Sequence, residues 1–211
     1  MVSEVIAVVI GYLLGSIPSA YIITRLATGK DIRQLGGGNV GGRNVFREVG
    51  LAAAIPVVIF DVGKGAAAVA IAHRLLDAPV YFVLAAGLAA VAGHIWSIFL
   101  KFTGGNGLAT TIGVLSVLMT RELLIALAIT VVLIVITRNT VLSVNISLLS
   151  VPVSVWFMEQ SWQLVVFSIV LLLVLVLHFL PTAMTAMAKA GSKEAFLAEL
   201  LRRDKVKKEE K

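Results

Sequence analysis

The sequence predicts an all-α integral membrane protein with about seven transmembrane helices, an outside N-terminus and a cytoplasmic C-terminus. Three observations favour this class: apolar residues make up 59 % of the 211 residues, charged residues only 14 %, and the mean hydropathy is +0.99. Because a soluble domain carries about 25 % charged residues, this chain has too few polar groups to cover a water-facing surface. We therefore expect a multi-pass protein of the cell (inner) membrane.

Seven apolar segments follow one another along the chain, near residues 2–27, 51–72, 79–100, 107–120, 123–137, 141–157 and 162–180. A membrane span needs about 20 predominantly apolar residues. The fourth and fifth segments are shorter, and Arg121-Glu122 separates them. A charged pair at mid-membrane would be costly, so we expect two short helices there. In the first segment, Pro18 should kink the helix.

The basic residues predict the orientation. With the N-terminus outside, four of them lie in the cytoplasmic 28–50 loop, one in the 101–106 loop, one at Arg138, and eight at or beyond Lys189. The outer loops then hold only Arg74 and Arg121. Such a bias is typical of cytoplasmic loops and not of a nucleic-acid-binding face. We expect residues 1–188 to form the membrane domain and 189–211 a basic amphipathic tail on the inner leaflet.

The loop from Gly36 to Arg47 is the first candidate for chemistry. Five of the seven residues 36–42 are glycines, which allow the backbone to curl and point several N–H groups at one anion. Arg43 and Arg47 would add charge-assisted hydrogen bonds. An ordinary flexible loop with inside-positive charges explains the pattern equally well. A dinucleotide site is disfavoured, because a membrane segment and not a strand precedes the glycines.

A second glycine-rich stretch, residues 104–107, comes just before the fourth apolar segment. Backbone N–H groups at a helix N-terminus attract anions, and Thr110 would add a hydroxyl. A tight turn between two membrane segments is the other interpretation. Two glycine-rich stretches on the same side of the membrane favour a site for two anionic groups.

A few ionisable residues lie inside the apolar segments. Asp61 and Lys64 are spaced to share one helix face. They can neutralise each other, or Lys64 can reach toward a phosphate. His94 and His178 lie at the same predicted depth, and each is either a structural histidine or a catalytic candidate. The sequence has no His-Glu-x-x-His motif and no Gly-x-Ser-x-Gly motif, so we expect neither a metal nor a covalent nucleophile.

Taken together in order and spacing, five elements resemble the bacterial acyl-phosphate:glycerol-3-phosphate acyltransferases, the PlsY family. These elements are Gly15 to Tyr21, Gly36 to Arg47, Asp61 to Gly65, Gly93-His94 with Phe99 to Gly113, and Thr137-Arg138. The resemblance implies seven helices with the N-terminus outside. It also implies transfer of a fatty acyl group from acyl phosphate to the sn-1 hydroxyl of glycerol 3-phosphate, which gives lysophosphatidic acid. The expected partners are these two substrates and membrane lipids, and no cofactor is implied.

The resemblance also implies the site residues. Those that match the family pattern and would bind substrate or phosphate are Gly38, Asn39, Asn44, Arg47, Lys64, Gly104, Gly105, Gly107, Thr110 and Arg138, with His94 and His178 as catalytic candidates.

The chain departs from the family pattern at several positions. Gly37 replaces a serine, Gly42-Arg43 an alanine-threonine pair, Asn106 a lysine and Pro181 a functional asparagine. We include Arg43, a new cation, and Asn106 among the phosphate-binding candidates. A catalytically impaired member that binds an anionic lipid or phosphate is the alternative. A small anion transporter is a further one, disfavoured because we find no internal repeat.

Overall fold

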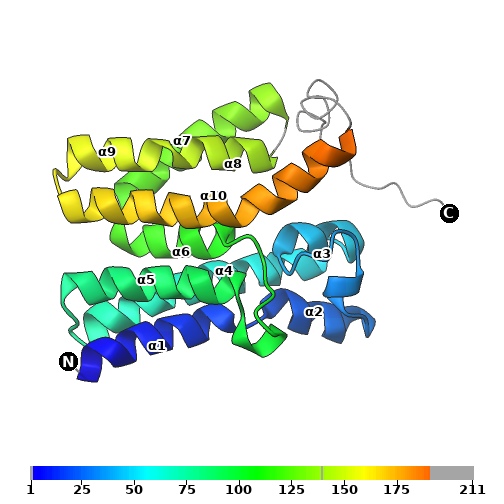
Figure 1. Ribbon diagram of the computed structural model, residues 1–211, viewed down its shortest axis with the longest axis horizontal. Helices are drawn as coiled ribbons and strands as arrows, with labels where there is room; N and C mark the ends of the chain where they lie inside the picture. Colours follow the sequence, from blue (N-terminus) through cyan, green and yellow to red (C-terminus); the bar gives the residue numbers. More distant parts are fainter. Residues whose placement is uncertain (1, 139, 191–211) are drawn as a thin grey trace. The chain divides into compact units, whose positions relative to one another are not determined.

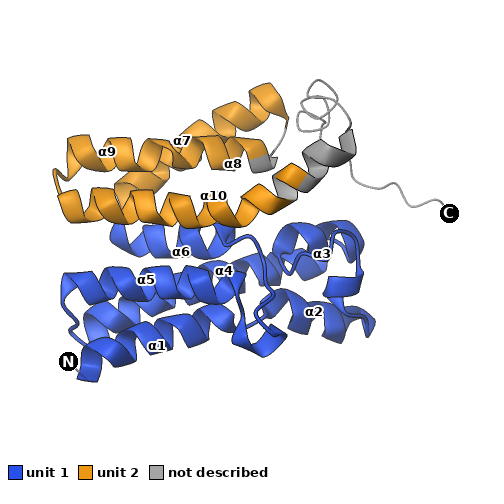
Figure 2. Cartoon of the chain, in the orientation of Figure 1, with its two compact units in different colours: residues 1–118 blue, residues 119–211 orange. Residues whose placement is uncertain are grey.

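The computed structural model describes residues 2–138 and 140–190, and these are almost entirely helical (Figure 1). The chain divides into two compact units, residues 1–118 and 119–211 (Figure 2). The helices of the first unit are α1 (Val2–Ser16), α2 (Ser19–Thr28), η1 (Ile32–Gln34), α3 (Gly42–Glu48), α4 (Leu51–Ala70), η2 (Ile71–Leu75), α5 (Val80–Ile95), η3 (Ile98–Leu100) and α6 (Leu108–Leu118). Those of the second are α7 (Thr120–Thr137), α8 (Thr140–Leu148), α9 (Ser150–Met158) and α10 (Trp162–Ala190). The predicted basic tail comprises residues 189–211, and its residues after 190 lie outside the described part of the chain.

Close helix packing holds the first unit together. α1 packs along α5, where a side chain at Gly11 or Gly15 would overlap the α5 backbone. α4 packs on α6 in the same way, through Gly65 and Gly113. Lipid gives no hydrophobic drive between helices, so small residues that allow close backbone contact favour association. These contacts bring the polar ends of α1, α4 and α5 close together.

The kink predicted at Pro18 is confirmed, because the helix stops before Ile17-Pro18 and restarts as α2. The break leaves backbone carbonyls without helical partners, and side chains from elsewhere in the first unit satisfy them. Ser97 Oγ donates to the carbonyl oxygen of Ser16 at 2.6 Å, and Lys64 Nζ donates to that of Ile17 at 3.0 Å. The break therefore joins α1 to α4 and to the loop after α5.

The second unit is stabilised partly by hydroxyl groups. α7 packs on α8, where Thr130 and Ser147 share a hydrogen bond and Thr137 and Ser143 share another of 3.0 Å. The expected separation of the fourth and fifth segments is confirmed, although the break comes at Met119, before the charged pair. The sixth predicted segment is one apolar stretch that is interrupted at Leu149, which divides it into α8 and α9.

Four of the described helical stretches are long and apolar enough to cross a membrane. They are Val2–Thr28, Leu51–Leu75, Thr120–Thr137 and Trp162–Pro181. Three shorter apolar helices are Val80–Ile95, Leu108–Leu118 and Leu142–Met158. These stretches correspond in order to the predicted segments. The all-α prediction is confirmed, while the number of spans and their orientation stay predictions.

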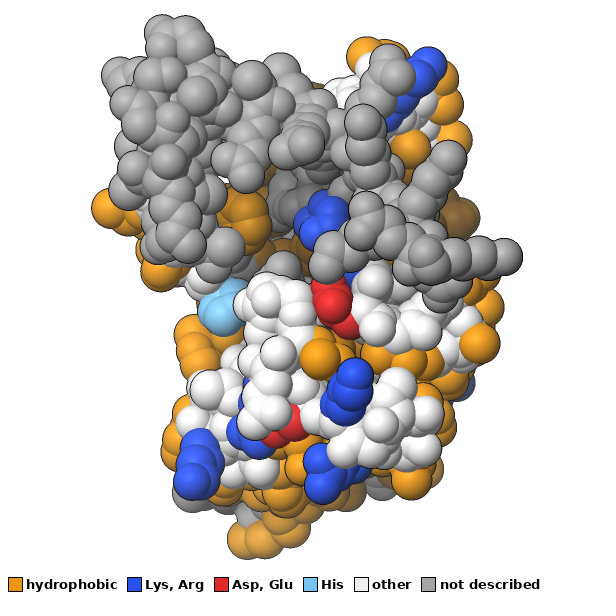
Figure 3. Space-filling model, turned by 90° about the vertical axis from the view of Figure 1, so that its right-hand side faces the viewer, with side chains coloured by type: hydrophobic (Ala, Val, Ile, Leu, Met, Phe, Trp, Pro, Cys, Tyr) orange, Lys and Arg blue, Asp and Glu red, His pale blue; other side chains and the backbone are white. Residues whose placement is uncertain are grey.

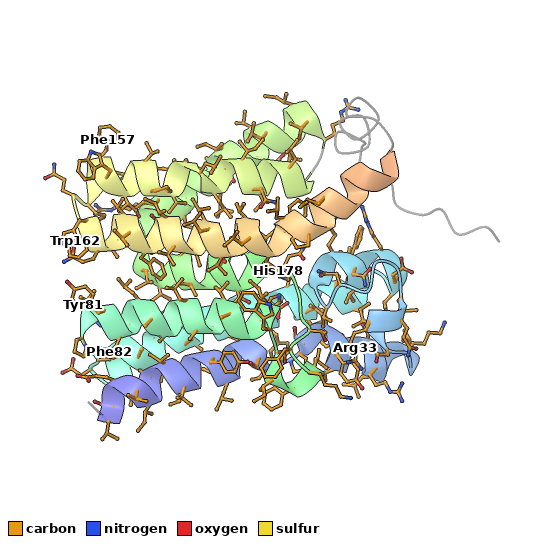
Figure 4. All side chains as sticks on the ribbon, in the orientation of Figure 1. Arg33, Tyr81, Phe82, Phe157, Trp162 and His178 are labelled. Carbon is orange, nitrogen blue, oxygen red and sulfur yellow. The ribbon has the colours of Figure 1, made fainter. Side chains whose placement is uncertain are left out.

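Aromatic side chains lie where α5 begins in the first unit and where α9 meets α10 in the second. In the first unit, Tyr81 and Phe82 lie at the start of α5, whereas Arg33 lies at the opposite end, in the segment after α2 (Figure 4). In the second unit, Phe157 and Trp162 lie at the turn between α9 and α10. Large aromatic side chains are enriched where a membrane meets water. Each of these aromatic positions is therefore suited to a membrane surface.

Candidate functional site

The carboxylate of Asp61, on α4, is the centre of a polar cluster in the first unit. The residue is only 1 % exposed. Its Oδ1 accepts hydrogen bonds from Ser19 Oγ at 2.7 Å and Lys64 Nζ at 2.8 Å. The same oxygen lies 3.5 Å from His94 Nδ1, on α5. The structure therefore shows Asp61 and Lys64 as an ion pair, which is the first of the two predicted arrangements.

Lys64 also stabilises the helix break. Its ammonium donates to Asp61 and to the carbonyl oxygen of Ile17, so two of its three N–H groups have partners. An unpaired ammonium in an apolar span would be costly, and the carboxylate offsets its charge. The phosphate-binding role of Lys64 stays a prediction, for which one N–H group remains.

A small pocket lies beside this cluster, with room for about one water molecule. The hydroxyl of Ser16 is buried there and has no hydrogen-bond partner among the described residues. Hydroxyl, carboxylate, ammonium and imidazole groups all face the pocket, which makes it suited to a small polar group. The residues that line it are Gly15, Ser16, Ile17, Pro18, Ser19, Val40, Asp61, Lys64, His94, Ser97, Leu100 and Gly104.

The glycine turn before α6 lies against His94. The N–H of Gly105 donates to the carbonyl oxygen of His94 at 3.1 Å. A side chain at Gly105 would overlap the His94 imidazole, and one at Gly104 would overlap the backbone at the end of α5. At Gly107, φ is +81°, a conformation that favours glycine. The turn therefore needs its glycines, and the imidazole lies directly beneath it.

Asn44 holds the first glycine loop in shape. Its side chain, buried on α3, donates to the carbonyl oxygens of Leu35 and Asn39, both at 3.0 Å. Gly36 and Gly38 have φ values of +55° and +72°, which L side chains rarely adopt. Asn44 was predicted to bind phosphate, and the structure shows it bonded to the loop backbone.

The two glycine-rich stretches meet in space. Asn39 Nδ2 donates to Asn106 Oδ1 at 2.7 Å, and the N–H of Val40 donates to the carbonyl oxygen of Gly104 at 3.3 Å. Arg43 and Arg47 are exposed on α3, which begins one residue after Gly41. Figure 3 shows Lys and Arg side chains among polar atoms in its lower part, at this end of the first unit. The contact between the two stretches borders the pocket, which Val40 and Gly104 both line.

The remaining candidates lie elsewhere. Thr110 is fully buried on α6, and its hydroxyl has no partner among the described residues. Arg138 and His178 belong to the second unit, where Arg138 is exposed at the end of α7 and His178 is half-buried on α10. The structure therefore joins His94 to the Asp61 cluster, while the roles of Arg138 and His178 stay predictions. Among the described residues, no group of three or more His, Cys, Asp or Glu side chains is placed to hold a metal ion.

Outside the apolar spans, an ion pair shapes the segment after α2. The Arg33 guanidinium donates to the Asp31 carboxylate at 2.7 Å and lies over the Tyr21 ring, 5.3 Å from its centre. The hydrogen bond from Arg33 lowers the pKa of the Asp31 carboxyl. Arg33 is thereby engaged within its own segment and contributes less charge to the glycine loops.

Sequence reasoning missed the serines of the site. Ser16, Ser19 and Ser97 line the pocket, but serine is common, and each carries no charge. One signal was present: a proline inside an apolar span frees carbonyl oxygens, and these need donors. That signal predicts that donors are needed at the break, but it does not say which side chains supply them.

Comparison with known proteins gives one consistent result. A family model described as glycerol-3-phosphate acyltransferase matches residues 5–186. Glycerol-3-phosphate acyltransferase 1 of Dehalococcoides mccartyi is 44 % identical over 178 residues, 82 % of this chain and 86 % of the relative. A glycerol-3-phosphate acyltransferase of Endomicrobium trichonymphae is 40 % identical over 177 residues, 83 % of this chain and 88 % of the relative.

Solved structures agree with these relatives. The crystal structure of PlsY, an integral membrane glycerol 3-phosphate acyltransferase, in its glycerol 3-phosphate form is similar with a TM-score of 0.83. It is 25 % identical in sequence, and the match covers 96 % of each chain. The lysophosphatidic acid form, 24 % identical with a TM-score of 0.81, shows the same fold.

Proposed function

The chain belongs to the glycerol-3-phosphate acyltransferase family, and from that premise we propose that it transfers a fatty acyl group from acyl phosphate to the sn-1 hydroxyl of glycerol 3-phosphate. In this reaction the hydroxyl oxygen forms an ester bond to the acyl carbon, and the bond from that carbon to the phosphate oxygen breaks. The hydroxyl proton leaves with inorganic phosphate. The product is lysophosphatidic acid, the first acylated intermediate of phospholipid synthesis.

The meeting of the two glycine-rich stretches, at Asn39 and Asn106, supports this proposal most directly. Acyl phosphate has a good leaving group, so catalysis needs no covalent nucleophile. The protein has to hold two phosphates and align a hydroxyl with a carbonyl carbon, by proximity and electrostatic stabilisation. Glycine backbones and the exposed cations Arg43 and Arg47 suit that task. The pocket below, which faces His94, suits an uncharged hydroxyl.

We assign the remaining roles by the same reasoning. Gly38, Gly104, Gly105 and Gly107 shape the backbone around the phosphates, Thr110 and Arg138 complete the substrate-binding set, and His94 and His178 are the catalytic candidates. Lys64 and Asn44 also shape the site, since both side chains are bonded to backbone carbonyls, and Lys64 keeps one N–H group for a phosphate.

The proposal includes the topology. The chain crosses the inner membrane seven times, with its N-terminus outside and its glycine-rich loops in the cytoplasm. Residues 1–188 form the membrane domain, and residues 189–211 form the basic tail. The chain has no cysteine, so an introduced one is a unique label. Gly37 and Arg74 are both exposed, and nothing lies near the side chain that Gly37→Cys adds. An impermeant maleimide should label Arg74→Cys in intact cells and leave Gly37→Cys unmodified. Labelling of Gly37→Cys in sealed cells would show that the chain has the opposite orientation to the one proposed.

Acyl transfer by the purified protein, with palmitoyl phosphate and labelled glycerol 3-phosphate, tests the function itself. We expect labelled lysophosphatidic acid, and Arg43→Ala should abolish its formation. Binding of glycerol 3-phosphate without acyl transfer would favour the alternative of a catalytically impaired family member. The observation that supports this alternative is that Asn106 and Pro181 stand where the family has a lysine and an asparagine. If the protein neither binds glycerol 3-phosphate nor transfers an acyl group, the proposal is rejected.

A further inference from the structure

The loop that carries the chain from α5 toward the glycine turn is unusually apolar on its outside. Trp96 is 43 % exposed, Ile98 47 %, Phe99 59 % and Phe102 61 %, whereas Leu100 points inward and is 5 % exposed. We call residues 96–102 the aromatic loop. It follows α5, one of the shorter apolar helices, and precedes the polar glycine turn, so it is an apolar surface at the edge of a polar site.

The aromatic loop is held in one conformation by its own hydrogen bonds. The carbonyl oxygen of Ser97 accepts from the N–H of Leu100 at 3.1 Å and of Phe102 at 2.8 Å, and Thr103 Oγ1 donates to the carbonyl oxygen of Leu100 at 2.6 Å. Lys101 and Phe102 have φ values of +55° and +59°, a left-handed conformation that is unfavourable for residues other than glycine. Two neighbouring residues other than glycine therefore hold this conformation in the aromatic loop, and the Phe102 ring is exposed there.

The aromatic loop is also fixed beside the pocket. Ser97 Oγ donates to the carbonyl oxygen of Ser16 at the α1 break, and Ser97 and Leu100 both line the pocket. Figure 1 shows the loop between α5 and α6 reaching the break between α1 and α2. The loop thus has a polar inner side that faces the pocket and an apolar outer side.

We propose that the aromatic loop lies in lipid at the membrane–water interface and that its outer side chains bind the acyl chain of the membrane-borne donor. Tryptophan and phenylalanine next to a lysine are the composition of an interfacial segment, with rings in the lipid and the ammonium toward the headgroups. The proposed acceptor is charged and comes from water, whereas the proposed donor is a lipid. A loop that is apolar outside and borders the polar pocket is where the two meet. The donor part rests on the proposed function, while the lipid part does not.

Fluorescence quenching tests the position of the loop without any need for activity. The chain has three tryptophans, so the double variant Trp156→Phe/Trp162→Phe leaves Trp96 as the only reporter. This variant is reconstituted into vesicles of lipids brominated either near the headgroup or near the chain end. We expect stronger quenching of Trp96 by bromines near the headgroup, and little quenching by iodide in the water. Strong iodide quenching without bromolipid quenching would place the loop in water and overturn the proposal.

Donor chain length tests acyl-chain binding. Phe99→Ser/Phe102→Ser should raise KM for palmitoyl phosphate at least about fivefold, because two exposed rings lose their apolar contact with the chain. KM for butyryl phosphate and for glycerol 3-phosphate should stay unchanged. Phe157→Ser is the matched control, since Phe157 is 74 % exposed in the second unit. It should change no constant, and the thermal midpoints of all variants should agree.

Three outcomes count against the proposal. An equal rise in KM for palmitoyl and butyryl phosphate would mean that the rings do not contact the chain. An equal effect of Phe157→Ser would mean that any exposed ring matters. If the unaltered protein transfers no acyl group from any donor, the proposed function and acyl-chain binding fall together, and quenching of Trp96 still decides whether the loop lies in lipid.

Discussion

Substitution of Asp61 by Asn removes one charge from the buried cluster while it keeps the side-chain volume. The carboxylate is 1 % exposed and Lys64, its partner at 2.8 Å, is 8 % exposed. Removal of one member of a buried ion pair costs about 3–5 kcal/mol, because the other charge stays buried without compensation. In a chain of this size each kcal/mol lowers the thermal midpoint by about 2–4 °C. We therefore expect Asp61→Asn to lower the midpoint by about 6–20 °C.

Thermal unfolding in detergent measures this change, with two controls. Asp31→Asn breaks an ion pair with Arg33 that lies near the surface, so it should lower the midpoint by less than about 4 °C. The pKa of Asp31 is lowered, so its stabilising contribution is complete above its ordinary pKa and is lost as the pH falls toward the lowered pKa. The comparison is therefore made at neutral pH. The double variant Asp61→Asn/Lys64→Met also removes the buried cation and should regain at least half of the loss. An effect of Asp61→Asn no larger than that of Asp31→Asn would refute the reasoning.

Three further predictions concern catalysis. Arg47→Ala should weaken glycerol 3-phosphate binding by about 10- to 150-fold in calorimetry, since a charge-assisted hydrogen bond contributes about 1.5–3 kcal/mol; unchanged binding by a folded variant would remove Arg47 from the site. Gly105→Ala should lower turnover by about 10²-fold, because the added methyl displaces the histidine side chain beneath the turn, whereas Gly37→Ala, with nothing within 4 Å, should be neutral. If Arg43 supplies the phosphate-binding charge, Asn106→Lys should either leave turnover unchanged or lower it. A rise in turnover of about tenfold or more would show that the site lacked a cation at position 106.

The helical architecture was predictable because its cause is local. Apolar length and the break at Pro18 are properties of neighbouring residues, and both appear in the structure. The break between the fourth and fifth segments was predicted from Arg121-Glu122, yet it comes at Met119. The charged pair instead begins α7, where the carboxylate of Glu122 lies in the first turn, the end of a helix that favours negative charge.

The site was only half predictable. The sequence placed the two glycine-rich stretches on the same side of the membrane, and the structure shows them in contact. The helical spacing of Asp61 and Lys64 allowed their pairing. Spacing says nothing about contacts between distant segments, so the bond from Lys64 to Ile17 and the approach of His94 to Asp61 were not foreseen. These contacts depend on how α4 and α5 pack against the broken first helix.

The positions of the cations indicate a division of roles within the first unit. A cation buried in an apolar span needs a carboxylate beside it, and a carboxylate weakens its attraction for a phosphate. Lys64 is such a cation, so its charge is used to join α4 to the α1 break. Arg43 and Arg47 are instead exposed on α3, where a cation does not need a buried carboxylate to offset its charge. We therefore expect Asn106 to be tolerated in place of the family's lysine, because the loop that contacts it, through Asn39, also carries the additional exposed cation Arg43.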